Sequence, residues 1–136
     1  MKNIGIWLDK EKASLVTRDD SGEKFQTIHS EVENYHVHGG SGTRLKGGPQ
    51  DVVQDSKYLE REKHQLKSYF RELANAVKEA DAIAIFGPAE TQQKFKKELQ
   101  ENFRAIDQKV KTVQVVDSMT DNQIKALVRD FFNEIQ

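Results

Sequence analysis

One stretch of the chain gathers residue types that suit contact with nucleic acid. His36–Gln50 has the sequence HVHGGSGTRLKGGPQ and holds five of the chain's eight glycines and one of its two prolines. Because glycine is entropically costly to fix and proline lacks an N–H donor, this density of breakers predicts a long exposed loop, which we place at 36–56. Long loops in compact domains are usually functional or disordered. The loop is therefore the first candidate for a functional site.

Basic side chains continue from this loop into the segment that follows it. Between residues 36 and 71 the formal charge is +3, whereas the rest of the chain carries −4 and the total is −1. A locally basic unit on an acidic body can meet phosphates, although a solvated helix face with mixed charges would give the same pattern. The candidate phosphate-binding residues are Arg44, Lys46, Lys57, Arg61, Lys63, His64 and Lys67.

Metal-dependent chemistry is a weaker alternative. His36, His38 and His64 would supply three neutral imidazoles without a nearby carboxylate, which is a poor ligand set, so we predict no metal and no other cofactor. Asp9 and Asp117 lie at the ends of predicted strands, where a nuclease could gather carboxylates around two metal ions. A charged turn, DKEK, explains Asp9 more simply.

The rest of the chain alternates between strand and helix patterns. The strand patterns lie at 3–8, 13–17, 24–32, 81–86 and 109–116, and the helical patterns lie at 57–79, 90–103 and from the cap at Thr120 or Asp121 to 135. The stretch DAIAIF at 81–86 is apolar on both faces, which is typical of a central parallel strand. The order βββαβαβα predicts an α/β domain, with a mixed five-stranded sheet and helices on its faces.

Length and composition limit the other classes of protein. The 136 residues fit a single domain over 1–136, with no repeat or linker that divides it. No run approaches the roughly 18 apolar residues of a membrane span, and the N-terminus lacks the apolar core of a signal peptide. The absence of cysteine fits a reducing compartment. We therefore expect a cytoplasmic protein without a membrane partner.

Four stretches and their order resemble the middle domain of class-1 release factors and Pelota, which has an RNase H-like fold. The stretches are IGIWLDKEKASLV, GGPQ in the loop, YLEREKHQLKSYFREL and GPAETQQKFKKEL. In that superfamily a long loop with a Gly-Gly-Gln motif precedes a basic helix, as GGPQ precedes YLEREKHQLKSYFREL here. The resemblance spans nearly the whole chain and implies a ribosome or tRNA partner for the loop and the basic helix.

The resemblance also implies a candidate catalytic group. In release factors the Gly-Gly-Gln tip enters the peptidyl-transferase centre, where the glutamine backbone N–H helps to hold the oxyanion or the attacking water of ester hydrolysis. Gly47, Gly48 and Gln50 match those positions. Pro49 splits the tripeptide, removes one N–H and restricts the residue before it, so binding without chemistry is favoured over peptidyl-tRNA hydrolysis. A non-catalytic protein-interaction module on the same fold is the alternative.

Overall fold

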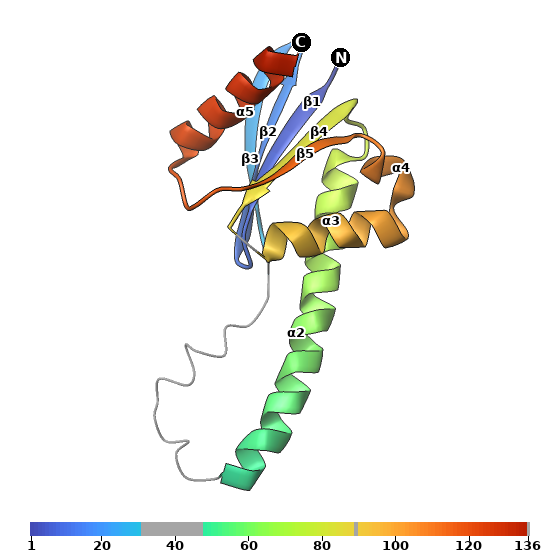
Figure 1. The fold of residues 1–136 in the computed structure, drawn as a ribbon, viewed down its shortest axis with the longest axis vertical. Helices are drawn as coiled ribbons and strands as arrows, with labels where there is room; N and C mark the ends of the chain where they lie inside the picture. Colours follow the sequence, from blue (N-terminus) through green and yellow to red (C-terminus); the bar gives the residue numbers. More distant parts are fainter. Residues whose placement is uncertain (31–47, 89, 136) are drawn as a thin grey trace.

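The protein forms one five-stranded sheet and four helices within the residues that its structure describes (Figure 1). The structure is a computed structural model, and the described residues are 1–30, 48–88 and 90–135. The strands are β1 (Asn3–Leu8), β2 (Lys12–Asp19), β3 (Gly22–His29), β4 (Ala82–Gly87) and β5 (Val110–Val115). The helices are α2 (Gly48–Val77), α3 (Thr91–Asn102), α4 (Arg104–Asp107) and α5 (Asp121–Ile135).

The sheet is mixed, in the order β3-β2-β1-β4-β5. The first three strands form an antiparallel meander, whereas β1 pairs in parallel with β4 and β4 pairs in parallel with β5. The two central strands, NIGIWL and AIAIFG, are buried along their whole length. Continuous burial is typical of strands covered on both faces. The mixed five-stranded sheet and the central parallel strand are therefore confirmed.

Helices cover both faces of the sheet. Figure 1 shows α2 and α3 on one face and α5 on the other. Because successive side chains of a strand point to opposite faces, β1 divides its residues between two cores. Ile6 lies in the core with Leu73 and Phe95, whereas Trp7 lies in the core with Val128 of α5. Trp7 and Ile6 therefore face opposite sides of the sheet.

Helix α5 begins at a capping box. The Thr120 hydroxyl oxygen accepts the backbone N–H of Gln123 at 3.2 Å, and the Gln123 side-chain oxygen accepts the backbone N–H of Thr120 at 2.9 Å. This reciprocal pair satisfies amide donors that the first turn would leave free. Farther along the helix, Phe132 is buried and packs edge-on against Phe131 at 5.2 Å between ring centroids. Phe132 is therefore a core residue of the α5 face of the sheet.

Helix α2 begins earlier than the sequence predicted. Its backbone is helical from Gly48, so residues 48–56, which we assigned to the loop, belong to the helix. Pro49 lies in the first turn, where its missing N–H has no intrahelical acceptor to lose and its fixed φ suits a helix. The glycine and proline that suggested a loop therefore mark a helix start. Figure 1 shows this end of α2 extending beyond the sheet.

The remaining boundaries differ by small amounts. Residues 36–47 of the predicted loop, and 31–32 of the predicted third strand, lie outside the described residues. The short helix α4 was not predicted. It follows α3 directly and returns the chain to β5, where the backbone N–H of Ile83 donates to the carbonyl of Lys109 at 3.0 Å.

The acidic turns of the meander are closed by local hydrogen bonds. The Asp9 carboxylate accepts the backbone N–H groups of Glu11 and Lys12 at 2.8 and 2.9 Å. At the next turn, the hydroxyl and the backbone N–H of Ser21 donate to the Asp19 carboxylate at 2.6 and 2.9 Å, and these hydrogen bonds lower the pKa of Asp19. The turn role predicted for Asp9 is confirmed.

Candidate nucleic-acid interface

A groove lies between α2 and α3. Its volume is about 650 Å³, and its floor is apolar because Leu66 and Phe70 lie there, exposed by only 9% and 4%. Its walls are charged. The wall residues are Lys63, His64 and Lys67 from α2, and Lys94, Lys97, Glu98 and Glu101 from α3.

Helical spacing explains why these side chains share one groove. On α3, Lys94 and Lys97 are three residues apart and fall on the same face. Phe95 and Leu99 are fully buried and anchor the other face of α3 to the sheet. The Phe95 ring packs against Phe70 of α2, with 5.5 Å between centroids. This aromatic contact fixes α3 across α2 and so sets the two walls of the groove.

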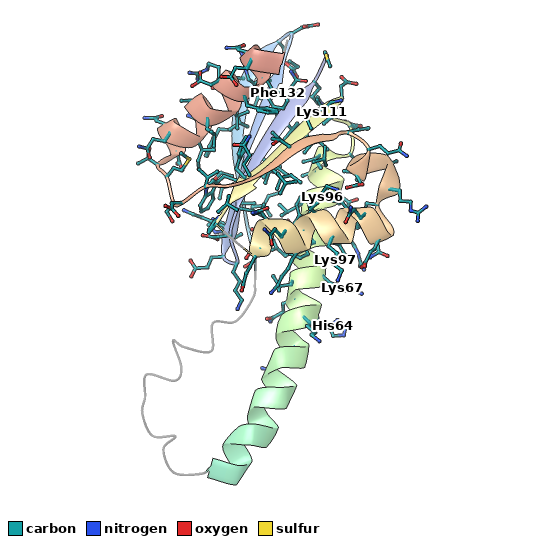
Figure 2. All side chains as sticks on the ribbon, in the orientation of Figure 1. His64, Lys67, Lys96, Lys97, Lys111 and Phe132 are labelled. Atoms are coloured by element: carbon teal, nitrogen blue, oxygen red, sulfur yellow. The ribbon has the colours of Figure 1, made fainter. Side chains whose placement is uncertain are left out.

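Four lysines of the groove make no salt bridge within the described part of the chain. They are Lys63 and Lys67 on α2 and Lys94 and Lys97 on α3. Lys96 differs, because its ammonium group lies 2.6 Å from the Asp107 carboxylate. Figure 2 shows Lys97, Lys67 and His64 following one another from α3 onto α2. Unpaired cations gathered in one groove attract phosphate groups from solution.

The structure divides the seven predicted phosphate-binding residues into four groups. Lys63, His64 and Lys67 line the groove, whereas Arg61 is exposed on α2 but does not line it. Lys57 belongs to α2, and nothing further is described of its side chain. Arg44 and Lys46 lie outside the described residues. Contact with RNA stays a prediction for all seven residues.

The two groove lysines on α3, Lys94 and Lys97, were not among the residues predicted from the sequence. The stretch TQQKFKKEL was interpreted only as a packing helix and as part of the resemblance. Its signal was present, since Lys94 and Lys97 flank the buried Phe95 at positions that cannot face the sheet. The sequence does not show that α3 packs against α2. Only this packing brings Lys94 and Lys97 opposite Lys63 and Lys67.

The candidate catalytic tripeptide is not tested by the structure. Gly47 lies outside the described residues, and Gly48 and Gln50 are described only as part of the first turn of α2. A catalytic role for these three residues therefore stays a prediction.

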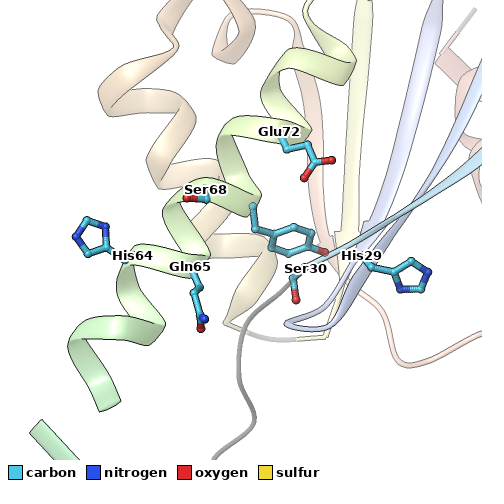
Figure 3. Close-up of a pocket in the computed structure, with 7 residues that line it drawn as sticks. His29, Ser30, His64, Gln65, Ser68 and Glu72 are labelled. Atoms are coloured by element: carbon cyan, nitrogen blue, oxygen red, sulfur yellow. The ribbon is translucent and has the colours of Figure 1, made fainter. Parts of the chain in front are cut away.

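A second hollow lies between the end of β3 and α2 (Figure 3). It has a volume of about 460 Å³, and its lining residues are His29, Ser30, His64, Gln65, Ser68, Tyr69 and Glu72. The Tyr69 hydroxyl donates to the backbone carbonyl of Asp9 at 3.1 Å. Burial, and then the negative charges of Asp9 and Glu72, raise the pKa of Tyr69, so its phenol stays neutral. Tyr69 therefore ties α2 to the β1–β2 turn.

The described residues give the nuclease alternative no support. They contain no group of three or more histidine, cysteine, aspartate or glutamate residues that could hold a metal ion. Asp9 uses one carboxylate oxygen to close its turn. Asp117, the other candidate, offers its backbone carbonyl to the Trp7 indole N–H at 3.2 Å.

Gln92 is a buried side chain at the start of α3. It is 1% exposed, and within the described structure neither atom of its amide has a hydrogen-bond partner. An amide buried in this way costs about 1–3 kcal/mol. Gln92→Met keeps the length of the side chain and removes the amide. We expect it to raise the free energy of unfolding by about 1 kcal/mol, measured by urea denaturation.

The matched control for this substitution is the neighbouring exposed residue. Gln93→Met is expected to change stability by less than about 0.5 kcal/mol. A Gln92→Met protein that is less stable than wild type would contradict the prediction, since it would show that the amide has a partner worth keeping.

Proteins of known structure share this fold. No protein-family model matches the chain, and no curated protein matches it. Among solved structures, it is similar to part of a translation termination factor and to part of two Pelota proteins. The archaeal translation termination factor aRF1 aligns with a TM-score of 0.56 and 9% identity, over 98% of this chain and 39% of that one.

Two Pelota structures are also similar to this chain over nearly its whole length. The protein from Archaeoglobus fulgidus aligns with a TM-score of 0.55 and 13% identity, over 98% of this chain and 34% of that one. The protein from Thermoplasma acidophilum aligns with a TM-score of 0.53 and 18% identity, over 98% of this chain and 32% of that one. The chain thus spans 32–39% of the length of these proteins. The predicted RNase H-like, release-factor- and Pelota-like fold is confirmed.

The described helices were also compared with the requirements of a membrane span. None of them is both long enough and apolar enough to cross a bilayer.

Proposed function

We propose that this domain binds ribosomal RNA or tRNA through the α2–α3 groove, as a ribosome-associated domain of the translation-factor type. The observation that supports the proposal is the set of four lysines on the two walls of one groove that make no salt bridge among the described residues. They occur on a fold shared with a translation termination factor and with Pelota. Binding through the Gly-rich loop and the basic helix that follows it, as predicted from the sequence, belongs to the same proposal.

The charge distribution favours attraction of RNA to the groove rather than to the protein as a whole. With a net charge of −1, the whole chain exerts little long-range electrostatic attraction on RNA. The groove concentrates four lysines against two carboxylates, Glu98 and Glu101. Because each lysine–phosphate contact releases a counterion, binding of this kind weakens steeply as salt rises. The proposal is one of binding, and peptidyl-tRNA hydrolysis by Gly47, Gly48 and Gln50 is not needed for it.

A protein partner is the second candidate. The observation that favours it is the apolar floor, where Leu66 and Phe70 lie under charged walls of both signs. Apolar grooves with charged rims are typical sites for amphipathic helices. An affinity pulldown that recovers a protein partner without RNA would favour this candidate over the first.

Ribosome co-sedimentation tests the proposal directly. We expect the wild type to pellet with ribosomes at low salt and to be released at high salt. The variant Lys94→Gln/Lys97→Gln removes the charge of one wall without placing new acids beside Glu98 and Glu101, and it should weaken association by about tenfold or more. The control Lys24→Gln/Lys111→Gln removes two exposed lysines that do not line the groove and should co-sediment as wild type does.

Two outcomes would refute the proposal. The first is no association of the wild type with ribosomes at any salt concentration. The second is equal loss in the groove variant and the control variant, because it would show that net charge alone governs binding.

A further inference from the structure

We infer that the groove binds the backbone of a double-helical segment of RNA, rather than the unpaired bases of a single strand. This inference rests on the proposed function and specifies which form of RNA, double-helical or single-stranded, the groove binds. It follows from the lysines on the two walls of the groove, and from the scarcity of exposed aromatic rings and of planar polar side chains among the described lining residues.

The described lining residues provide little for base stacking. Proteins that bind single strands stack successive bases on exposed aromatic rings, each worth about 1–3 kcal/mol. The phenylalanine in this groove, Phe70, is 4% exposed and is occupied by its contact with Phe95. His64 is exposed at the rim, and it is the only described lining residue with an accessible ring. One imidazole cannot form a platform for a run of bases.

The polar groups of the groove are also unsuited to reading base edges. Bases are recognised by planar side chains that make paired hydrogen bonds, chiefly arginine, asparagine and glutamine. Among the described residues that line the groove there is none of these three types. Lysine carries a compact point charge on a flexible stem. Such a charge contacts phosphate oxygens, which fix position but carry no sequence information.

The two walls together suit a helix with two phosphate rows. Lys63 and Lys67 are one turn apart on α2, and Lys94 and Lys97 lie on α3 across the groove. A single strand presents one flexible row of phosphates, whereas a duplex presents two rows held at a fixed separation. Since α2 and α3 are joined by the Phe70–Phe95 contact, the backbone positions that carry these lysines are fixed relative to one another. A rigid pair of walls therefore favours a rigid ligand, recognised by its shape.

Fluorescence anisotropy with two labelled RNAs tests this inference. The probes are an RNA duplex of about 16 base pairs, the length that a double-stranded RNA-binding domain spans, and one of its strands chosen to be unstructured. We expect the wild type to bind the duplex at least tenfold more tightly than the single strand at the same salt concentration. Equal or tighter binding of the single strand would overturn the inference and leave the proposed function standing.

His64→Ala separates the two modes of binding within one protein. If the groove binds a duplex by its backbone, His64→Ala should weaken single-strand binding by no more than it weakens duplex binding, because the ring stacks on no base. A loss of single-strand affinity that exceeds the loss of duplex affinity by about tenfold or more would show that the imidazole stacks on an unpaired base, since that is the size of a stacking contact, and would overturn the inference. Failure of the wild type to bind either RNA would refute the proposed function itself, and the inference with it.

Discussion

Replacing all four groove lysines by glutamine is expected to lower the affinity for RNA by about 100-fold or more near 0.1 M salt. Each phosphate contact made by a lysine contributes roughly 0.7–0.9 to the slope of log Kobs against log salt. If Lys63, Lys67, Lys94 and Lys97 each neutralise one phosphate, the slope should become shallower by about three in the quadruple variant. Because the effect is electrostatic, it should shrink as salt is raised. A salt titration of RNA binding measures both quantities.

The control for this variant removes the same charge from elsewhere. Lys12, Lys24, Lys78 and Lys111 are exposed, and none of them lines the groove. Their replacement by glutamine gives a protein of identical net charge with an intact groove, which should keep most of the wild-type affinity and slope. If the two quadruple variants lose affinity equally, RNA binding would be a property of net charge and the groove would have no special role.

The sheet could be predicted from the sequence because its signals are local. AIAIF at 82–86 is apolar at every position, and the structure places this segment between two parallel partners as β4. Alternation in NIGIWL likewise separated Trp7 from Ile6 before any packing was known. Both patterns follow directly from the two-residue period of a strand. A neighbour's identity is not needed to recognise them.

The start of α2 could not be predicted in the same way. Glycine and proline break the interior of a helix, but both are compatible with its first turn. The sequence GGPQDVVQDS therefore supports a loop or a helix start equally well, and the loop interpretation was wrong for residues 48–56. The charge pattern of α2 alone was also insufficient for the site, since half of the groove's lysines come from α3.

The largest expected effect on stability belongs to Gly87, the last residue of β4. Gly87→Ala should lower the free energy of unfolding by about 4 kcal/mol or more, measured by urea denaturation. The backbone φ of Gly87 is 152°, a conformation that side chains disfavour, and an added Cβ would lie 2.2 Å from the backbone carbonyl oxygen of Leu8. That oxygen belongs to β1, so relief of the clash would require β1 and β4 to separate at the centre of the sheet.

Gly22→Ala separates the two causes of this instability. Gly22 also has a positive φ, 126°, but nothing lies within 4 Å of the Cβ that alanine would add. Its substitution should therefore cost only the backbone strain, about 1–2 kcal/mol. The difference between the two variants measures the steric contact with Leu8. Similar losses in both would show that β1 and β4 can yield at Gly87, whereas a Gly87→Ala protein that is insoluble beside a folded Gly22→Ala protein would agree with a rigid central pair. Because α3 starts only four residues after Gly87, that rigidity is also what holds Lys94 and Lys97 in position across from α2.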